Sequence, residues 1–97
     1  MTELEMHTAL RHYLDEAGRL RQYPTRRKLR QVALAWLAGQ FLPGRDYTEK
    51  EVNAVIGDFY GDICLLRREL VRFRFLDRER DGSRYWLHDP QPEVPLP

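Results

Sequence analysis

Apolar residues follow one another at helical spacing from the start of the chain. Thr2 and Glu5 match a capping box, in which each residue satisfies a backbone N–H of the other. The apolar positions that follow lie three or four residues apart up to Gly18: Met6, Ala9, Leu10, Tyr13, Leu14 and Ala17. The pattern predicts an N-terminal helix within residues 1–18.

A second apolar stripe predicts the central helix of the core. Residues 19–23 are expected to be a short extended segment, because Pro24 disfavours helical geometry just before it. Thr25 can act as the N-cap of a helix that ends at Gly39. Its apolar stripe consists of Leu29, Val32, Ala33, Trp36 and Leu37. We therefore expect Trp36 to be buried.

Two further helices are predicted close together. Residues 48–51 form a second capping box, and the apolar residues Val52, Val55 and Ile56 continue this helix to Gly57. Asp62 can cap a fourth helix over residues 62–73. Its apolar side consists of Ile63, Leu66, Leu70 and Phe73. The two helices and their short connection form a helix-turn-helix pair.

The pattern then changes to that of a β-hairpin. Residues 76–80 and 83–87 read as strands, with Trp86 on the second, and Asp81-Gly82 between them is a strong signal for a tight turn. A hairpin after a helix-turn-helix pair occupies the position of a wing. The expected fold is mainly α with a small β-hairpin (α+β), a winged helix-turn-helix-like domain.

The length of 97 residues allows one domain with one core. We expect that domain over residues 1–88, followed by a Pro-rich extended tail at residues 89–97. The tail is either a plain chain end or a docking segment for a partner. The hydrophobic share of 42% and the charged share of 32% are typical of a globular protein.

The sequence predicts a cytoplasmic protein without membrane contact. Its longest apolar run, residues 32–38, is far shorter than the roughly 20 residues of a membrane-spanning helix. Glu3 and Glu5 stand where a secretory signal would carry basic residues. Cys64, the single cysteine, cannot form an internal disulfide, which agrees with a reducing compartment.

Five short motifs occur in order along residues 18–86. They are Gly18-Arg19-Leu20, Pro24-Thr25-Arg26-Arg27-Lys28, Tyr47-Thr48-Glu49-Lys50-Glu51-Val52-Asn53, Leu66-Arg67-Arg68-Glu69-Leu70-Val71 and Asp81-Gly82-Ser83-Arg84-Tyr85-Trp86. With these motifs the chain resembles a bacterial family of winged-helix-like domains, domain of unknown function 2087, which occurs alone or attached to transcriptional regulators. The resemblance implies a winged-helix fold and a role in transcriptional regulation; residues 24–88 would form the family core.

No catalytic or metal site is expected. His7, His12, His88 and Cys64 show none of the short spacings of metal ligands, and surface positions explain the histidines. Ser83, the only serine, follows the hairpin glycine, where small polar residues are common. We therefore expect a non-enzymatic protein with no cofactor and no small-molecule substrate.

Local basic regions make DNA the favoured partner, although the formal net charge is only +1. Residues 19–30 contain six basic and no acidic side chains. On the fourth helix, steps of about 100° per residue turn Arg68 and Arg72 away from the apolar side. In winged-helix proteins this helix enters the major groove, where arginine can bind guanine or phosphate.

Other basic residues have two interpretations each. Arg67 lies on the flank of the fourth helix and either contacts DNA or pairs with a carboxylate such as Asp62 or Glu51. Arg80 and Arg84 flank the hairpin tip and either reach the DNA or pair with acidic residues of the hairpin.

The cluster formed by Arg26, Arg27, Lys28 and Arg30 opposes the dipole of its helix, so that an anion should offset it. That anion is either a phosphate or a carboxylate of the first helix region: Glu3, Glu5, Asp15 or Glu16.

A protein-interaction winged helix is the alternative function. Leu65, an apolar residue on the outward side of the fourth helix, is unusual for insertion into a DNA groove. In this alternative the first or the fourth helix binds a protein partner or a second copy of the chain, and nucleic acid takes no part.

Overall fold

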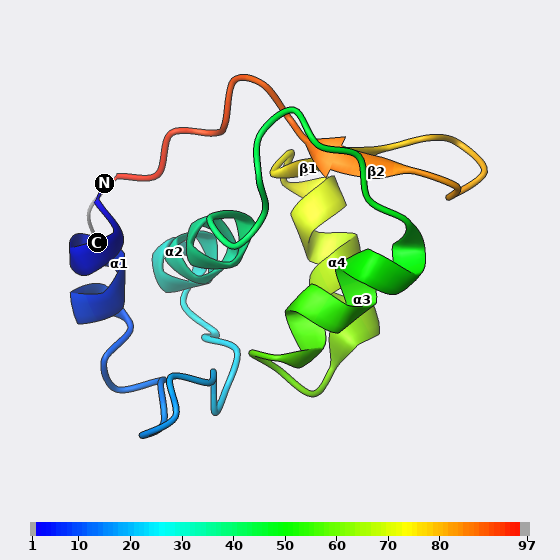
Figure 1. Ribbon diagram of the computed structural model, residues 1–97. Helices are drawn as coiled ribbons and strands as arrows, with labels where there is room; N and C mark the ends of the chain where they lie inside the picture. The colour runs from blue at the N-terminus through cyan, green and yellow to red at the C-terminus, as the bar shows by residue number, and fades with distance from the viewer. Residues whose placement is uncertain (1, 96–97) are drawn as a thin grey trace.

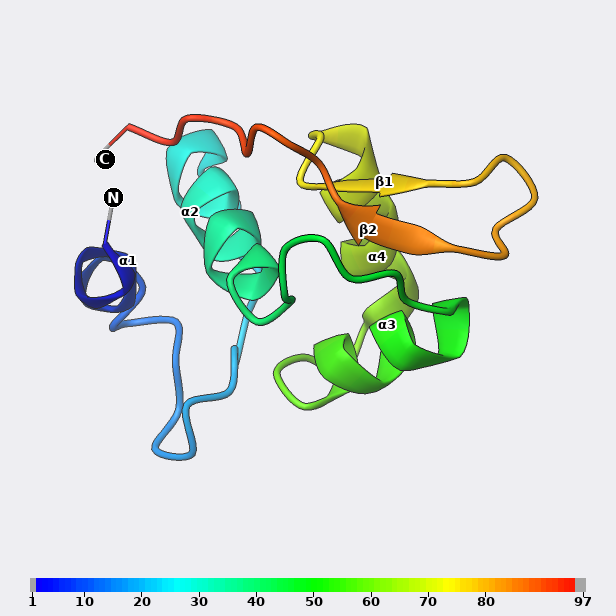
Figure 2. The same cartoon turned by 45° about the horizontal axis from the view of Figure 1, so that its top comes forward.

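The computed structural model describes residues 2–95 and contains four helices followed by a two-stranded antiparallel hairpin. The elements are α1 (Glu3–Ala9), α2 (Arg27–Ala38), α3 (Glu49–Gly57), α4 (Ile63–Arg72), β1 (Leu76–Arg78) and β2 (Tyr85–Leu87). In Figures 1 and 2, α2 lies between α1 and the α3–α4 pair, and the hairpin projects beyond α4 on the side away from α1. This is the winged-helix-like α+β fold that the pattern predicts.

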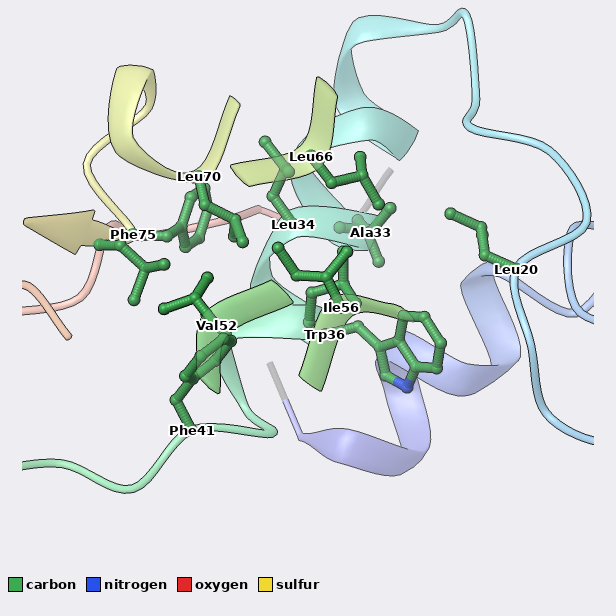
Figure 3. Close-up of a cluster of buried hydrophobic side chains, with 14 of the residues drawn as sticks. Leu20, Ala33, Leu34, Trp36, Phe41, Val52, Ile56, Leu66, Leu70 and Phe75 are labelled. Atoms are coloured by element: carbon green, nitrogen blue, oxygen red, sulfur yellow. The ribbon is translucent and has the colours of Figure 1, made fainter. Parts of the chain in front are cut away.

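The core forms where α2, α3 and α4 meet. Figure 3 shows side chains from the three helices converging: Leu34 and Trp36 from α2, Val52 and Ile56 from α3, and Leu66 and Leu70 from α4. Trp36 is 4% exposed, and its ring meets that of Phe59 edge-on at a centroid distance of 5.1 Å. The predicted burial of Trp36 is confirmed. The buried surface of α2 is wider than the predicted stripe, because other elements cover the helix on more than one side.

The caps of α3 and α4 form as the sequence predicts. The Thr48 hydroxyl accepts the Glu51 N–H, and the Glu51 carboxylate accepts the Thr48 N–H. The Asp62 carboxylate accepts the Leu65 N–H at 3.2 Å. These local bonds determine where both helices begin.

The segment before α3 joins the hairpin. The backbone N–H of Tyr47 donates to the carbonyl of Tyr85 at 2.7 Å, and the reverse bond has the same length. Tyr47 therefore forms an isolated antiparallel β-bridge with the edge of the hairpin. The sequence pattern did not predict this contact, which holds the helix-turn-helix pair and the hairpin together.

The predicted N-terminal helix is wrong beyond Ala9. The capping box at its start is present, but the chain then turns back on itself around Asp15 and Gly18. The Asp15 carboxylate accepts the N–H groups of Ala17 and Arg19, and Gly18 takes a positive φ of 80°. This turn chemistry outweighs the helical spacing of the apolar residues.

The segment after this turn is anchored to α3. The Arg19 guanidinium donates to the carbonyls of Gly57 and Asp58 at 2.9 and 2.8 Å, which satisfies groups that the helix end leaves free. Leu20 donates its N–H to the Phe59 carbonyl at 2.7 Å and forms a β-bridge with Leu14. The extended geometry expected here is confirmed at Leu20.

The start of α2 differs from the prediction. Its N-cap is Arg26, which makes no side-chain cap, and not Thr25. Pro24 is fully buried and disfavours helical geometry at Tyr23 before it, and helical geometry begins at Arg27, one residue later than expected.

The hairpin lies where the sequence predicts it but has shorter strands. Glu79 donates its N–H to the Arg84 carbonyl at 2.8 Å, which leaves a loop of the four residues 80–83 in place of a two-residue turn. Inside the loop, Asp81 accepts the Ser83 N–H and Gly82 has a φ of 77°. The Asx turn at Asp81 explains why the loop is longer than predicted.

The C-terminal segment returns toward α1. In both views it crosses over α2, and the two ends of the described chain lie near each other (Figures 1 and 2). The Gln91 amide donates to the carbonyls of Phe75 and His88, and Val94 packs against the core. Residues 91–95 form neither helix nor strand, and residues 96–97 of the expected tail lie outside the described residues. None of the helices in residues 2–95 has the length and hydrophobicity that a bilayer crossing requires.

Candidate nucleic-acid interface

The outward face of α4 carries two exposed arginines. Leu66 and Leu70 are fully buried, and their spacing turns Arg68 and Arg72 toward solvent, as the helical pattern predicts. Arg68 bonds only the backbone carbonyl of Cys64, at 3.4 Å, and Arg72 lies over the Phe73 ring at 5.4 Å. Within residues 2–95 neither arginine has a carboxylate partner, so both guanidinium groups are available to an external anion.

Arg67 is a structural contact between α4 and α3. Its guanidinium donates to the Asn53 amide oxygen at 2.5 Å and pairs with Glu49 at 3.2 Å. Its side chain is only 17% exposed. Arg67 therefore pairs with a carboxylate, which was one of its two interpretations from the sequence. Its partners, however, are Glu49 and Asn53, not Asp62 or Glu51.

Replacement of Arg67 by alanine is expected to lower the free energy of unfolding by about 1 to 3 kcal/mol. The change removes a mostly buried, charged hydrogen-bond donor that joins α3 to α4. Arg68→Ala, one position along the same helix, is the matched control and should change stability by no more than about 0.5 kcal/mol. Urea unfolding measures both; equal effects would show that Arg67 does not hold the helices together.

Arg84 is also used within the fold. Its guanidinium pairs with Asp46 at 3.1 Å and with Glu79, and it lies 4.5 Å above the Trp86 ring. The hydrogen bond to Glu79 and then that to Asp46 raise the pKa of Arg84 above its ordinary value. Arg84 was predicted either to reach DNA or to pair with acidic residues of the hairpin. The structure shows ion pairs with Glu79 of the hairpin and with Asp46 beside it.

Arg80 is exposed in the hairpin loop, on a side rich in acidic groups. It lines a depression between the hairpin and the start of α3 together with the carboxylates of Asp46, Glu51, Glu79 and Asp81. Acidic neighbours weaken attraction to a polyanion. This side of the hairpin is poorly suited to DNA.

The opposite face of the hairpin brings Arg78 next to α4. Residues of a strand alternate between its faces, so Arg78 shares the side of the buried Leu76 and Tyr85. A depression between α4 and the hairpin is lined by Arg68, Arg72 and Arg78, together with Leu65, Arg67, Glu69, Val71 and Tyr85. Sequence reasoning missed Arg78, although counting by two from the apolar Leu76 places it on this side.

The basic cluster before and in the first turn of α2 is solvent-exposed. Arg26, Arg27 and Lys28 form no ion pair with any residue from 2 to 95. The carboxylates of the first helix region that the sequence suggested as partners therefore do not pair with this cluster. The intramolecular pairing expected with the first helix region is therefore not found there. Arg27, but neither Arg26 nor Lys28, lines a hollow shared with Arg72.

The side chains capable of catalysis or metal binding are scattered. Cys64 is exposed in the first turn of α4, and Ser83 lies in the hairpin loop. His88 is partly exposed, and its Nδ1 lies 2.8 Å from an Asp77 carboxylate oxygen, so it is a hydrogen-bonded histidine at the surface and not a freely solvated one. No group of three or more His, Cys, Asp or Glu side chains among the described residues is arranged to hold a metal ion.

Comparison with known proteins assigns the chain to a family. The family described as "Uncharacterized protein conserved in bacteria (DUF2087)" matches residues 19–87, more than two thirds of the sequence. The match begins at Arg19, the residue that bonds the end of α3, and ends at the last residue of β2. No curated protein and no solved structure matches the chain. The protein belongs to the DUF2087 family of uncharacterized bacterial proteins.

Proposed function

We propose that the protein binds double-stranded DNA through α4 and the adjoining face of the hairpin, and that it does so without catalysing a reaction. The observation that carries the proposal is the set of three exposed arginines, Arg68, Arg72 and Arg78, that line one depression between these two elements. None of the three forms an ion pair within residues 2–95.

The order of elements supports this assignment of α4. It is the second helix of a helix-turn-helix pair and is followed by a hairpin, as in winged-helix proteins whose second helix enters the major groove. From that position Arg68 and Arg72 can form paired hydrogen bonds to guanine or contact phosphates. Arg78, at the end of β1, can hold a phosphate beside the helix. The resemblance to domains attached to transcriptional regulators makes transcriptional regulation the proposed context.

The alternative of protein recognition through α4 finds less support. Leu65 is half-buried in the depression between α4 and the hairpin. The large hydrophobic side chains that are strongly exposed are Leu4, in α1, and Leu42, after α2. Among the described residues, the outward face of α4 therefore lacks the exposed apolar patch that a protein partner would bury.

Arg78 and Arg80 provide a matched test of which face of the hairpin binds. If Arg78 contacts a phosphate, Arg78→Ala should reduce the salt dependence of DNA binding by about one unit of slope. Arg80→Ala removes the same charge two residues away, among carboxylates, and should change the slope much less. Fluorescence anisotropy with a labelled duplex across a chloride series measures both. Loss of binding in Arg80→Ala alone would place the interface on the opposite face, and absence of duplex binding by the parent would refute the proposed function.

A further inference from the structure

A second group of arginines meets where the first turns of α2 approach the end of α4. A hollow there is lined by Arg27, Arg30, Gln31, Leu34, Arg72 and Phe73. Three of the six residues carry a positive charge, one offers a side-chain amide and none is acidic. Two separate elements therefore contribute three arginine side chains to the wall of one hollow.

No residue of the described chain forms an ion pair with this group. Arg27, Arg30 and Arg72 form no ion pair with any residue from 2 to 95. Glu69, one turn before Phe73 on α4, does not line the hollow, and its carboxylate accepts a hydrogen bond from the Tyr23 hydroxyl at 3.3 Å. The three like charges repel one another, and an anion in the hollow would remove that repulsion.

The two helix ends beside the hollow act on an anion in opposite directions. Arg27 is the first residue of α2, and the N-cap residue Arg26 supplies no side-chain acceptor to the free backbone N–H groups, so this end favours an anion. Arg72 and Phe73 lie at the C-terminal end of α4, whose free carbonyls disfavour an anion, so the preference comes from the three arginines.

We infer that this hollow binds one phosphate group. Arginine donates several N–H bonds in a planar fork that fits phosphate oxygens, and the Gln31 amide can donate one more. Arg72 lines both this hollow and the depression between α4 and the hairpin. A backbone phosphate of bound DNA can therefore reach the hollow. If DNA supplies the phosphate, the inference rests on the proposed function. A free phosphate is the other source of the same group.

The test uses the full chain and the variants Arg27→Gln, Arg30→Gln and the double variant. Lys28→Gln is the matched control, because it removes a charge from the same helical turn without lining the hollow. Thermal melting first establishes that each variant is folded. One arm measures affinity for a duplex across a chloride series. The other replaces chloride by inorganic phosphate at constant ionic strength and follows the amide chemical shifts of residues 26–31.

The two arms distinguish the source of the phosphate. For a DNA phosphate, the double variant should bind the duplex with a salt slope lower by about one, because one phosphate contact is lost, while Lys28→Gln keeps the parental slope. For a free phosphate, saturable shifts in the parent should disappear in the double variant. Either result supports the inference.

The outcomes that overturn the inference are separate from those that refute DNA binding. Parental slopes in the Arg27 and Arg30 variants, with no saturable phosphate shifts, would leave the proposed function intact and remove the hollow as a site. Equal effects of Lys28→Gln and Arg27→Gln in both arms would also overturn it, because charge alone would then explain them. If the parent binds no duplex, the proposed function fails, and the phosphate arm alone decides this inference.

Discussion

Replacement of Trp36 by alanine is expected to destabilise the protein by about 3 to 5 kcal/mol. The side chain is 4% exposed and lies among Ile56 and Phe59, in the region where α2 meets α3 (Figure 3). Removal of the indole leaves a large cavity. The packed helices α2, α3 and α4 hold one another in place and cannot move together to fill it. Small domains are stable by roughly 5 to 15 kcal/mol, so the variant should lose a large part of its stability and melt at a much lower temperature than the parent.

Trp86→Ala is the control, because it removes the same side chain from a partly exposed position on β2. That variant loses the contact with Arg84 and should be destabilised by about 1 kcal/mol. Thermal and urea unfolding measure both. A Trp36→Ala variant that melts within a few degrees of the parent would mean that the core is not organised around α2.

Elements determined by neighbouring residues could be predicted from the sequence. The Thr48 capping box and the Asp62 cap fixed the starts of α3 and α4, because both signals act within three residues. The existence and position of the hairpin followed from the turn signal Asp81-Gly82, although the loop is longer than the tight turn expected from it.

Errors arose where two local preferences competed. The apolar spacing up to Ala17 fits a helix, but Asp15 and Gly18 favour a turn, and the turn prevailed. The signal for this turn was present in the sequence.

The partners of charged residues could not be predicted, because they depend on how distant elements pack. Arg67 was correctly placed on the flank of α4, yet its partners Glu49 and Asn53 follow from the position of α3. The pairing of Arg84 with Asp46 likewise requires the approach of the segment before α3 to the hairpin. Which arginines remain available for DNA is therefore a tertiary property.

The double variant Arg68→Ala, Arg72→Ala is expected to lose most of its affinity for DNA. If both side chains contact bases, the loss should be about 2 to 6 kcal/mol, since each good contact contributes about 1 to 3 kcal/mol. If both contact phosphates, the salt slope should instead fall by about two. Stability should change little, because both side chains are exposed and form no ion pair within residues 2–95.

The same variant separates DNA binding from protein recognition. In the protein-interaction alternative, loss of the two arginines leaves any DNA signal unchanged, and Leu65→Asp breaks an assembly that size-exclusion chromatography detects. In the DNA-binding account, Leu65→Asp does not change the elution volume.

The most direct measurement of the central claim is the affinity of the parent and of the Arg68, Arg72 double variant for one random-sequence duplex over a chloride series. The account predicts that the parent binds saturably at low salt and that the logarithm of its association constant falls linearly with that of salt concentration, by about 0.9 per phosphate contacted. The double variant should bind more weakly. Absence of saturable binding by the parent at low salt, or equal affinity and slope for the two proteins, would contradict recognition of DNA by α4.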